Sequence, residues 1–255
     1  MHEIIDSHCH LDLPAFDSDR WEVIARARAA GVIAFVVPGT TAVSWEKLLR
    51  ITAEADCLHP ALGLHPYFME QHRPGDITAL AELCRKRRPV AIGEIGLDFQ
   101  LAEFDADAQQ TLLTEQLRLA AELELPVILH VRKAHDAMLK ALRRSGVKGG
   151  ICHAFNGSLQ QAQQYMKLGF LFGFGGMLTY PRSHRLHRLA RELPLDHIVL
   201  ETDAPDMAGA LHRGERNSPE YLPEVLEALA RLREEPAAEI ARQTTENVRR
   251  VLELA

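Results

Sequence analysis

The sequence predicts an α/β fold of the (β/α)8 class, a TIM barrel formed by one domain over residues 1–255. Three observations favour this fold. Eight short apolar segments alternate along the chain with eight stretches of helical periodicity. The length of 255 residues is typical of one such barrel. No GxGxxG motif follows the first segment, which disfavours the competing fold, an open doubly wound sheet.

The predicted strands are short, apolar and rich in β-branched side chains. They are expected at residues 3–8, 32–38, 58–64, 89–95, 126–131, 149–154, 169–175 and 197–203. The seventh has the weakest strand propensity, because Gly169, Gly173 and Gly175 interrupt it and Gly176 follows it.

The predicted helices carry apolar residues three and four positions apart, so that each presents one apolar face. They are expected at residues 18–30, 44–55, 78–87, 105–123, 134–144, 158–168, 184–192 and 219–233. Several begin at residue types that cap helices. Asp17 and Ser18 stand at the start of the first, Ser158 at the sixth, and Ser218 before Pro219 at the eighth.

Composition and charge limit the classes of function. The chain is 47% hydrophobic and 25% charged, the balance of an ordinary globular protein. Its net charge of −6 excludes a global basic field, so a DNA or RNA substrate would have to be held by local groups or metal ions. The basic run at residues 85–88 is interpreted as a solvated helix end at the rim opposite the site.

The sequence shows neither a signal-peptide pattern nor an apolar stretch of membrane-spanning length. Its four cysteines form no CxxC pair, and Cys9 and Cys152 lie in apolar segments, which is typical of core packing. We therefore expect a cytoplasmic protein with reduced thiols, no membrane partner and no obligate protein partner.

Residue types that bind metals lie at the carboxyl ends of most predicted strands, the rim on which barrel enzymes carry their active sites. They are His8 and His10, His65, Glu94, His130, His153 and Asp203. One such residue is commonly structural, but this set on one rim would leave several buried charges and imidazoles without partners unless a metal were bound. Imidazole and carboxylate ligands suit Zn, Mn or Fe, whereas carboxylate and water suit Mg.

The stretch DSHCHLD places two of these histidines two residues apart. Residues at that spacing in a strand share a face, so His8 and His10 are expected to point into the barrel mouth and Cys9 outward. Asp6 is expected on the same inward face, one layer deeper. Its carboxylate would then orient a ligand or hold buried charge.

The same spacing relates Glu201 to Asp203 in ETDAP, so Glu201 is also expected one layer deeper, orienting a ligand. Six ligands, with His65 set apart, exceed the three that one catalytic zinc requires. They fit two ions if a carboxylate bridges them. Glu94 is central among the ligating strands and is the predicted bridge.

These residues, in this order, resemble the TatD family of metal-dependent hydrolases, within the amidohydrolase superfamily. The matching segments run from residue 6 to residue 219 and are DSHCHLD, GLHP, GEIGLD, ILHVRKAHD, CHAFNGS, ETDAP and RGERNSP. The combination is specific, although HxH alone is weak. The resemblance implies two divalent cations, Mg, Mn or Zn. One would be bound by His8, His10, Glu94 and Asp203, and the other by Glu94, His130 and His153.

The function expected from this resemblance is hydrolysis of phosphodiester bonds in DNA, with RNA also considered, by a deoxyribonuclease or 3′-5′ exonuclease. A water bound to the metal pair would lose its proton near neutral pH and attack as hydroxide. Asp203 is expected to act as general base and Glu94 to join it in catalysis. His65 and Arg132 are candidates to hold a phosphate. Arg213, Arg216 and Asn217 would either grip substrate or order their loop.

Two other functions stay open at the level of sequence. The first is hydrolysis of another ester or an amide, such as a small substrate of the amidohydrolase type or an aminoacyl-tRNA ester. The second is a non-catalytic, metal-bound binding protein, which a complete ligand set disfavours. A basic groove leading to His8 and Asp203 would favour nucleic acid, and a closed apolar pocket would favour a small amide or ester.

Overall fold

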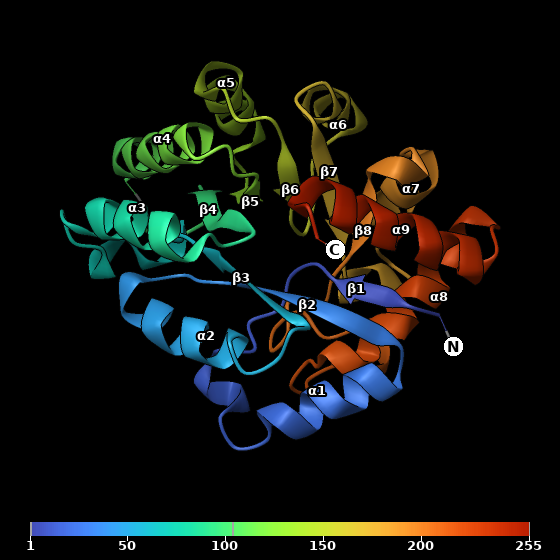
Figure 1. Ribbon diagram of the computed structural model, residues 1–255. Helices are drawn as coiled ribbons and strands as arrows, with labels where there is room; N and C mark the ends of the chain where they lie inside the picture. The colour runs from blue at the N-terminus through green and yellow to red at the C-terminus, as the bar shows by residue number, and fades with distance from the viewer. Residues whose placement is uncertain (1, 104, 255) are drawn as a thin grey trace.

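The computed structural model describes residues 2–103 and 105–254. Eight parallel strands pair in chain order, β1 beside β2 through to β8, and helices surround them (Figure 1). The strands are β1 (Ile4–Asp6), β2 (Val32–Pro38), β3 (Leu58–Leu62), β4 (Ala91–Asp98), β5 (Val127–Arg132), β6 (Gly150–Cys152), β7 (Phe170–Phe174) and β8 (Ile198–Leu200). The predicted barrel architecture is therefore confirmed.

The first and last strands meet and close the barrel. The backbone N–H of Ser7 donates to the carbonyl of Leu200 at 3.0 Å, and that of Asp203 donates to the carbonyl of His8 at 2.9 Å. These bonds join the chain just beyond β1 to the chain at and beyond β8. The two ends of the chain that carry candidate ligands are therefore held side by side.

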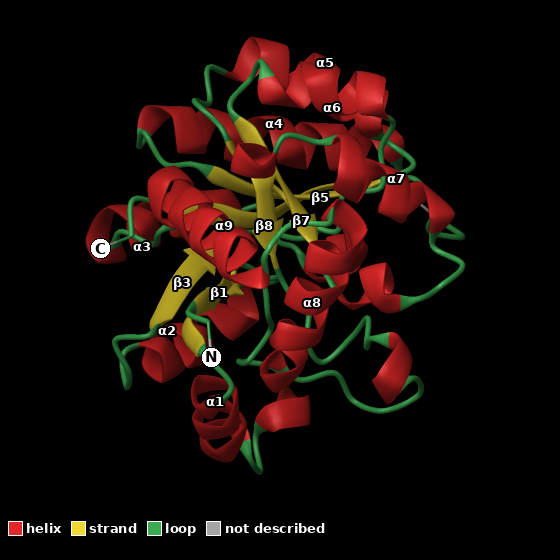
Figure 2. Ribbon diagram, turned by 90° about the vertical axis from the view of Figure 1, so that its right-hand side faces the viewer, coloured by secondary structure: helices red, strands yellow, loops and turns green. Residues whose placement is uncertain are grey.

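The helices alternate with the strands, and the loops at one end of the barrel are longer, on the right in the side view of Figure 2. They are α1 (Arg20–Ala29), α2 (Trp45–Thr52), α3 (Asp76–Arg87), α4 (Ala106–Glu122), α5 (His135–Ser145), α6 (Leu159–Met166), α7 (His184–Glu192), α8 (Leu222–Arg233) and α9 (Ala237–Leu252). The first eight follow the predicted order, each within a few residues of its expected bounds.

Two of the expected helix starts are wrong and one is confirmed. Ser158 caps α6 in a capping box with Gln161. Asp17 does not cap α1, because its carboxylate pairs with Arg20 and Lys47. The segment after Ser218 forms a short 3-10 helix before α8 begins, so its proline starts that turn rather than the α-helix.

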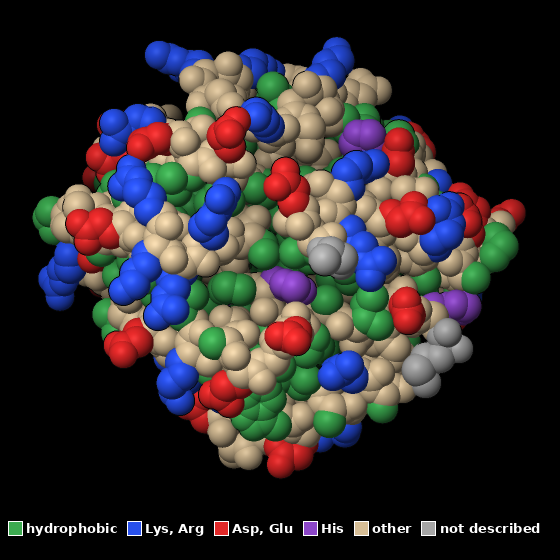
Figure 3. Space-filling model, in the orientation of Figure 1, with side chains coloured by type: hydrophobic (Ala, Val, Ile, Leu, Met, Phe, Trp, Pro, Cys, Tyr) green, Lys and Arg blue, Asp and Glu red, His purple; other side chains and the backbone are tan. Residues whose placement is uncertain are grey.

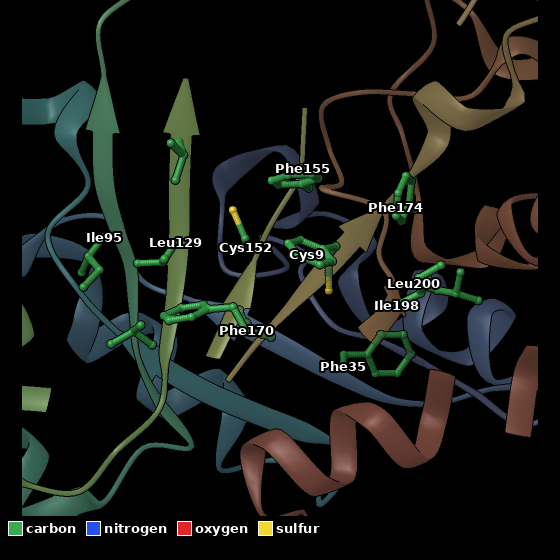
Figure 4. Packing of buried hydrophobic residues seen from close by; sticks show 14 of the residues in the cluster. Cys9, Phe35, Ile95, Leu129, Cys152, Phe155, Phe170, Phe174, Ile198 and Leu200 are labelled. Atoms are coloured by element: carbon green, nitrogen blue, oxygen red, sulfur yellow. The ribbon is translucent and has the colours of Figure 1, made fainter. Parts of the chain in front are cut away.

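Side chains alternate along the strands between two apolar clusters. The interior of the barrel is filled by small and branched side chains: Ile5, Ala34, Val36, Ala61, Ala91, Ile128, Ile151, Leu171 and Val199. The outer face packs against the helices with larger ones, including Phe35, Phe170 and Phe174 (Figure 4). Cys9 and Cys152 are fully buried there as free thiols, which confirms their place in the core.

The ninth helix is absent from the sequence-based expectation. α9 covers the amino end of the barrel and crosses in front of the strands in Figure 1. Thr245 Oγ1 donates to the carbonyl of Glu3 at 3.1 Å, and Asn247 Nδ2 donates to that of Ile198 at 2.7 Å. Val248 and Leu252 belong to the interior cluster and close it at the amino end of the barrel.

Leu252→Ala is expected to lower the free energy of unfolding by about 2–5 kcal/mol, because it opens a cavity at the sealed end of the barrel. Leu252 is 3% exposed. Arg249→Ala on the exposed side of the same helix is the control and should change stability by less than about 0.5 kcal/mol. Chemical denaturation followed by circular dichroism measures both. Equal effects would contradict the sealing role of α9.

The end of the barrel that carries α9 has mixed surface charge (Figure 3). Lys and Arg side chains gather over α3, on the left, the helix whose last turn holds Arg85, Lys86 and Arg87. The structure therefore places this basic run at the rim opposite the ligand-bearing loops, as expected. Among residues 2–103 and 105–254, no helix combines the length and apolarity that crossing a bilayer requires.

Candidate metal centre

A first group of four ligand atoms meets at the carboxyl end of the barrel. Nε2 of His8 and Nε2 of His10 lie 3.2 Å apart. Oδ1 of Asp203 lies 3.5 Å from each of them. Oε2 of Glu94 lies 3.3 Å from the nitrogen of His8 and 3.6 Å from that of His10. Residues separated by nearly the whole chain therefore face one point.

These distances match the space that one metal ion requires. Four donors placed tetrahedrally at about 2.0–2.1 Å from an ion stand roughly 3.3–3.4 Å apart. The two histidine nitrogens stand 3.2 Å from each other and 3.3–3.6 Å from the two carboxylates, and the atoms of His8, His10 and Asp203 all lie within 4.8 Å of one another. Two imidazoles with two carboxylates also form a donor set suited to Zn or Mn. The residues present therefore fit a divalent cation.

The other oxygen of Glu94 faces a second group of histidines. Its Oε1 lies 3.1 Å from Nδ1 of His130, 3.4 Å from Nε2 of His153 and 3.2 Å from Nε2 of His65. The rings of His8 and His153 stack at 3.9 Å, so the two groups adjoin. The carboxylate of Glu94 thus lies between both groups, the position that a bridging ligand requires.

The hydrogen bonds of the Nδ1 atoms distinguish His65 from His10. His10 Nδ1 donates to the carbonyl of Pro38 at 3.2 Å, which leaves the lone pair on Nε2 free for a metal. His65 is the reverse, because its Nδ1 accepts from the backbone N–H of Tyr67 at 3.0 Å. Neutral His65 therefore carries its proton on Nε2 and donates toward Glu94. This geometry suits a hydrogen-bond donor rather than a metal ligand.

Asp98 is a site residue that sequence reasoning missed. Its Oδ2 lies 3.1 Å from Nε2 of His130, and the side chain is 1% exposed. Gln109 of α4 fixes the backbone of Asp98 from both sides, since its amide donates to the carbonyl and accepts from the N–H. The signal was in GEIGLD, because Asp98 follows Glu94 by four residues in one strand and so shares its face.

Asp6 lies in the seam between β1 and β8. Its carboxylate accepts from the backbone N–H groups of His8 at 3.3 Å and Thr202 at 3.0 Å, and from the hydroxyl of Thr202 at 2.6 Å. Ile5, and not Asp6, belongs to the interior cluster. The hydrogen bonds of Asp6 go to backbone N–H groups and one hydroxyl, so the expectation that Asp6 orients a ligand side chain stays a prediction. The contacts still link Asp6 to the backbone that carries His8.

Glu201 lies one layer below the ligands. Its Oε1 accepts from the backbone N–H of Ala154 at 2.6 Å and lies 3.3 Å from Nδ1 of His153. This contact places an acceptor on the far side of His153 and favours a free lone pair on its Nε2. The carboxylate of Glu201 packs against Gly173 of β7. A Cβ atom added to Gly173 would lie 1.9 Å from Oε2 of Glu201. The glycine that weakens the strand makes room for this carboxylate.

The protonation pattern shows a strong excess of buried negative charge. Burial lowers the pKa of His10, but the hydrogen bond and charge of Asp203 outweigh it and raise the pKa to about 9. Burial opposes ionisation of Glu94, yet the surrounding imidazoles hold its pKa well below the usual range. In contrast, burial lowers the pKa of His65 to about 4. The carboxylates thus favour positive charge in the site, and a divalent cation held by these residues would supply that charge without protons.

A cavity of about 720 Å³ opens above the two groups. Arg132 is exposed at its edge, and Asn156, Tyr67 and Met207 also line it. Most of its remaining wall is apolar, from Phe174, Met177, Leu178 and Leu186.

The loop after β8 is ordered by its own polar residues. Arg216 donates to both carboxylate oxygens of Asp19, at 2.9 and 2.6 Å. Asn217 Nδ2 donates to the carbonyls of Thr202 and Asp206, at 2.8 and 2.7 Å. Of the two expected roles for these residues, the contacts support ordering of the loop, which fixes the chain around Asp203.

Comparison with known proteins extends these observations. The family model described as TatD related DNase matches residues 5–253. An uncharacterized metal-dependent hydrolase of Escherichia coli, YjjV, is 42% identical over 246 residues, which are 95% of each chain. The 3′-5′ ssDNA/RNA exonuclease TatD of Klebsiella pneumoniae is 34% identical over 253 residues, 96% of each chain.

The crystal structure of E. coli YjjV superposes with a TM-score of 0.95 at 40% identity, over 99% of this chain and 98% of that one. A TatD-family hydrolase of Entamoeba histolytica, at 20% identity, shares the fold with a TM-score of 0.88. The family match and the relatives cover the barrel and the strands that carry the candidate ligands. This chain therefore belongs to the TatD family of metal-dependent hydrolases.

Proposed function

We propose that this protein hydrolyses phosphodiester bonds in single-stranded DNA or RNA, as a 3′-5′ exonuclease that uses two divalent cations. The observation that carries the proposal is the carboxylate of Glu94, whose two oxygens face two separate groups of histidines. The relative from K. pneumoniae, named as an exonuclease of this specificity, supports the choice of substrate.

His8, His10, Asp203 and Glu94 would hold one ion, and Glu94, His130 and His153 the other. Bound there, two cations would supply an activated water and stabilise the charge on the leaving oxygen. Asp98 and Glu201 keep His130 and His153 oriented by contacts on the far side of each ring. All these side chains stand on strands or directly after them, which makes the site rigid.

Asp203 is the carboxylate best placed to accept a proton from the attacking water. Its side chain is 15% exposed to the cavity, against 3% for Glu94. Its backbone adopts φ of 58°, in the left-handed region that aspartate tolerates, and the N–H bonded to the carbonyl of His8 holds it there. Arg132 at the cavity edge is the group proposed to hold the phosphate, because the single N–H of neutral His65 is directed at Glu94.

The test is a reconstitution assay. Chelator-stripped protein receives Mg, Mn or Zn and is offered single-stranded DNA, duplex DNA and an RNA oligomer. We expect metal-dependent shortening from the 3′ end of single strands. Asp203→Asn serves as the control for contaminating nuclease. The absence of any cleavage of nucleic acid by reconstituted protein would overturn the proposal.

A second candidate is hydrolysis of another ester or an amide on a small substrate. The observation that favours it is the apolar wall formed by Met177, Leu178 and Leu186, which offers a phosphate chain no partner. A panel of small esters and amides, run beside the oligonucleotides with the same ions, separates the two. Turnover of the small esters or amides, without cleavage of the oligonucleotides, would favour this second function.

His65→Ala is expected to keep both ions while kcat/KM falls about ten- to a hundredfold. The reason is that His65 donates a hydrogen bond to the carboxylate of Glu94, and hydrogen bonds to charged groups contribute about 1.5–3 kcal/mol. Metal content measured by mass spectrometry and kinetics on a phosphodiester together test this role. Loss of one ion from the variant would make His65 a ligand and contradict its assignment as donor.

A further inference from the structure

We propose that the single strand being degraded leaves the active-site cavity over Asn156 and runs along a basic furrow between α5, α6 and α7. The furrow consists of two depressions lined by Lys133, Arg185 and Arg188. This inference rests on the proposed function and adds the path and the phosphate contacts of the strand outside the reacting nucleotide.

The cavity and the two depressions form a continuous series. The first depression, of about 450 Å³, shares Asn156 with the active-site cavity and is lined by Lys133 and Arg185. The second, of about 300 Å³, shares Arg185 with the first and adds Arg188. Neighbouring hollows thus share a lining residue, and a chain leaving the metal groups in this direction meets the three hollows in turn.

The furrow is positive although the protein as a whole carries −6. Lys133 and Arg185 have exposed side chains. Within the described parts of the chain, Arg188 alone of the three cations pairs with a carboxylate, Glu192 at 2.7 Å. Asp136 is the carboxylate that lines the first depression, and Gln161 Nε2 donates to it at 2.9 Å. Phosphates would thus meet cations left free for them.

Among the described residues that line the cavity itself, Arg132 is the one lysine or arginine, and the side away from the furrow carries none. There the wall is formed by Leu13, Tyr67, Met207 and the exposed carboxylate of Asp206. A polyanion is repelled or left without partners on that side. The distribution of charge around the cavity therefore favours a nucleic-acid strand that leaves the metal groups toward the furrow.

Asn156 lines both the cavity and the furrow, and its side chain is held in place by hydrogen bonds. Nε2 of His135 lies 3.2 Å from its Oδ1, and Nδ1 of the same ring lies 3.2 Å from the hydroxyl of Tyr165. His135 is 7% exposed and Tyr165 is fully buried. This buried relay holds the exposed amide of Asn156 in place, where it can bond to the backbone or base of a passing nucleotide.

The cavity volume favours a single strand. A hollow of about 720 Å³ at the end of a barrel holds a terminal nucleotide and its neighbour, not a duplex about 20 Å across. The furrow lies between helix ends and continues at the same level. We therefore assign it to one strand, and duplex binding becomes an outcome of the test.

The test compares two double variants that remove the same charge. Lys133→Gln with Arg185→Gln neutralises the furrow. Arg87→Gln with Arg88→Gln neutralises two exposed cations at the opposite rim. The control is matched in backbone too, because Lys133 and Arg88 both have positive φ, 53° and 44°. All proteins are loaded with the same ion, and their melting temperatures establish that they fold.

Binding is measured by fluorescence anisotropy of a labelled octanucleotide with a phosphorothioate-protected 3′ end, from 50 to 200 mM salt. The furrow variant is expected to bind about tenfold more weakly, with a salt slope smaller by about 1.4, since each phosphate contact of a single strand contributes about 0.7. The control variant should match the wild type. The ratio of kcat/KM for an octanucleotide to that for a dinucleotide should fall in parallel.

The outcomes separate this inference from the proposed function. Wild-type protein that cleaves no nucleic acid in the reconstitution assay defeats the proposed function. Wild-type protein that cleaves, with the two double variants binding the octanucleotide equally well, defeats the furrow alone. A furrow variant that loses affinity for a duplex but not for the single strand would overturn the assignment to one strand.

Discussion

Glu94→Gln is expected to abolish stoichiometric binding of the two proposed cations and to reduce turnover by at least a hundredfold. Each oxygen of Glu94 faces a different group, His8 and His10 on one side and His130 and His153 on the other. The glutamine amide keeps the shape of the glutamate side chain but removes its negative charge and replaces one oxygen acceptor with a donor. Loss of a partner outside the ligand set already costs about 10–100-fold in affinity or activity, so loss of a shared ligand should cost more.

Asp203→Asn provides the matched comparison, because it makes the same chemical change in a carboxylate that faces one group. Oδ1 of Asp203 approaches His8 and His10, and no such contact joins it to His130. We expect this variant to retain the ion of the second group while it loses turnover. Metal content after dialysis at a fixed free-ion concentration measures both variants. If Glu94→Gln kept two ions, the shared position of Glu94 would be wrong.

The strand ends could be predicted because two regularities act together. Parallel strands in chain order place all their carboxyl ends at one rim, and a residue at such an end must face the mouth or the helices. His8, His153 and Asp203 could therefore be grouped from spacing alone, although they lie in different thirds of the chain. β6 and β8 are shorter than predicted, since the candidate ligands His153 and Asp203 lie just beyond the paired residues.

The features that sequence reasoning missed depend on contacts between distant segments. α9 has the periodicity of the other helices, but among the described residues no strand follows it, and the eight strand–helix units are complete without it. The role of Asp98 requires the ring of His130 to turn its Nε2 away from Glu94. The separation of His65 from the ligands depends on one backbone N–H of Tyr67. The spacing from Glu94 to Asp98 and the periodicity of α9 are local signals, but the contacts that give both features their roles, and the orientation of His65, involve distant segments or a single backbone bond.

Gly173→Ala is expected to lower the free energy of unfolding by about 1–3 kcal/mol and to impair the second group of ligands. The added Cβ would stand 1.9 Å from Oε2 and 2.4 Å from Cδ of Glu201. Glu201 is 1% exposed and cannot retreat into solvent. Its displacement would break the bond to the N–H of Ala154 and withdraw the acceptor beside His153.

Gly75→Ala is the control for the general effect of an added methyl group, because no atom lies within 4 Å of a Cβ at that position. The double variant Gly173→Ala with Glu201→Ala tests the cause. If the clash with Glu201 is responsible, removing that carboxylate makes the two changes strongly non-additive, with a coupling of about 0.5–3 kcal/mol in favour of the double variant. Additive losses would show that Gly173 is required for the strand itself. In that case the need for glycine at position 173 would come from the backbone of β7, and not from the space that the carboxylate of Glu201 occupies.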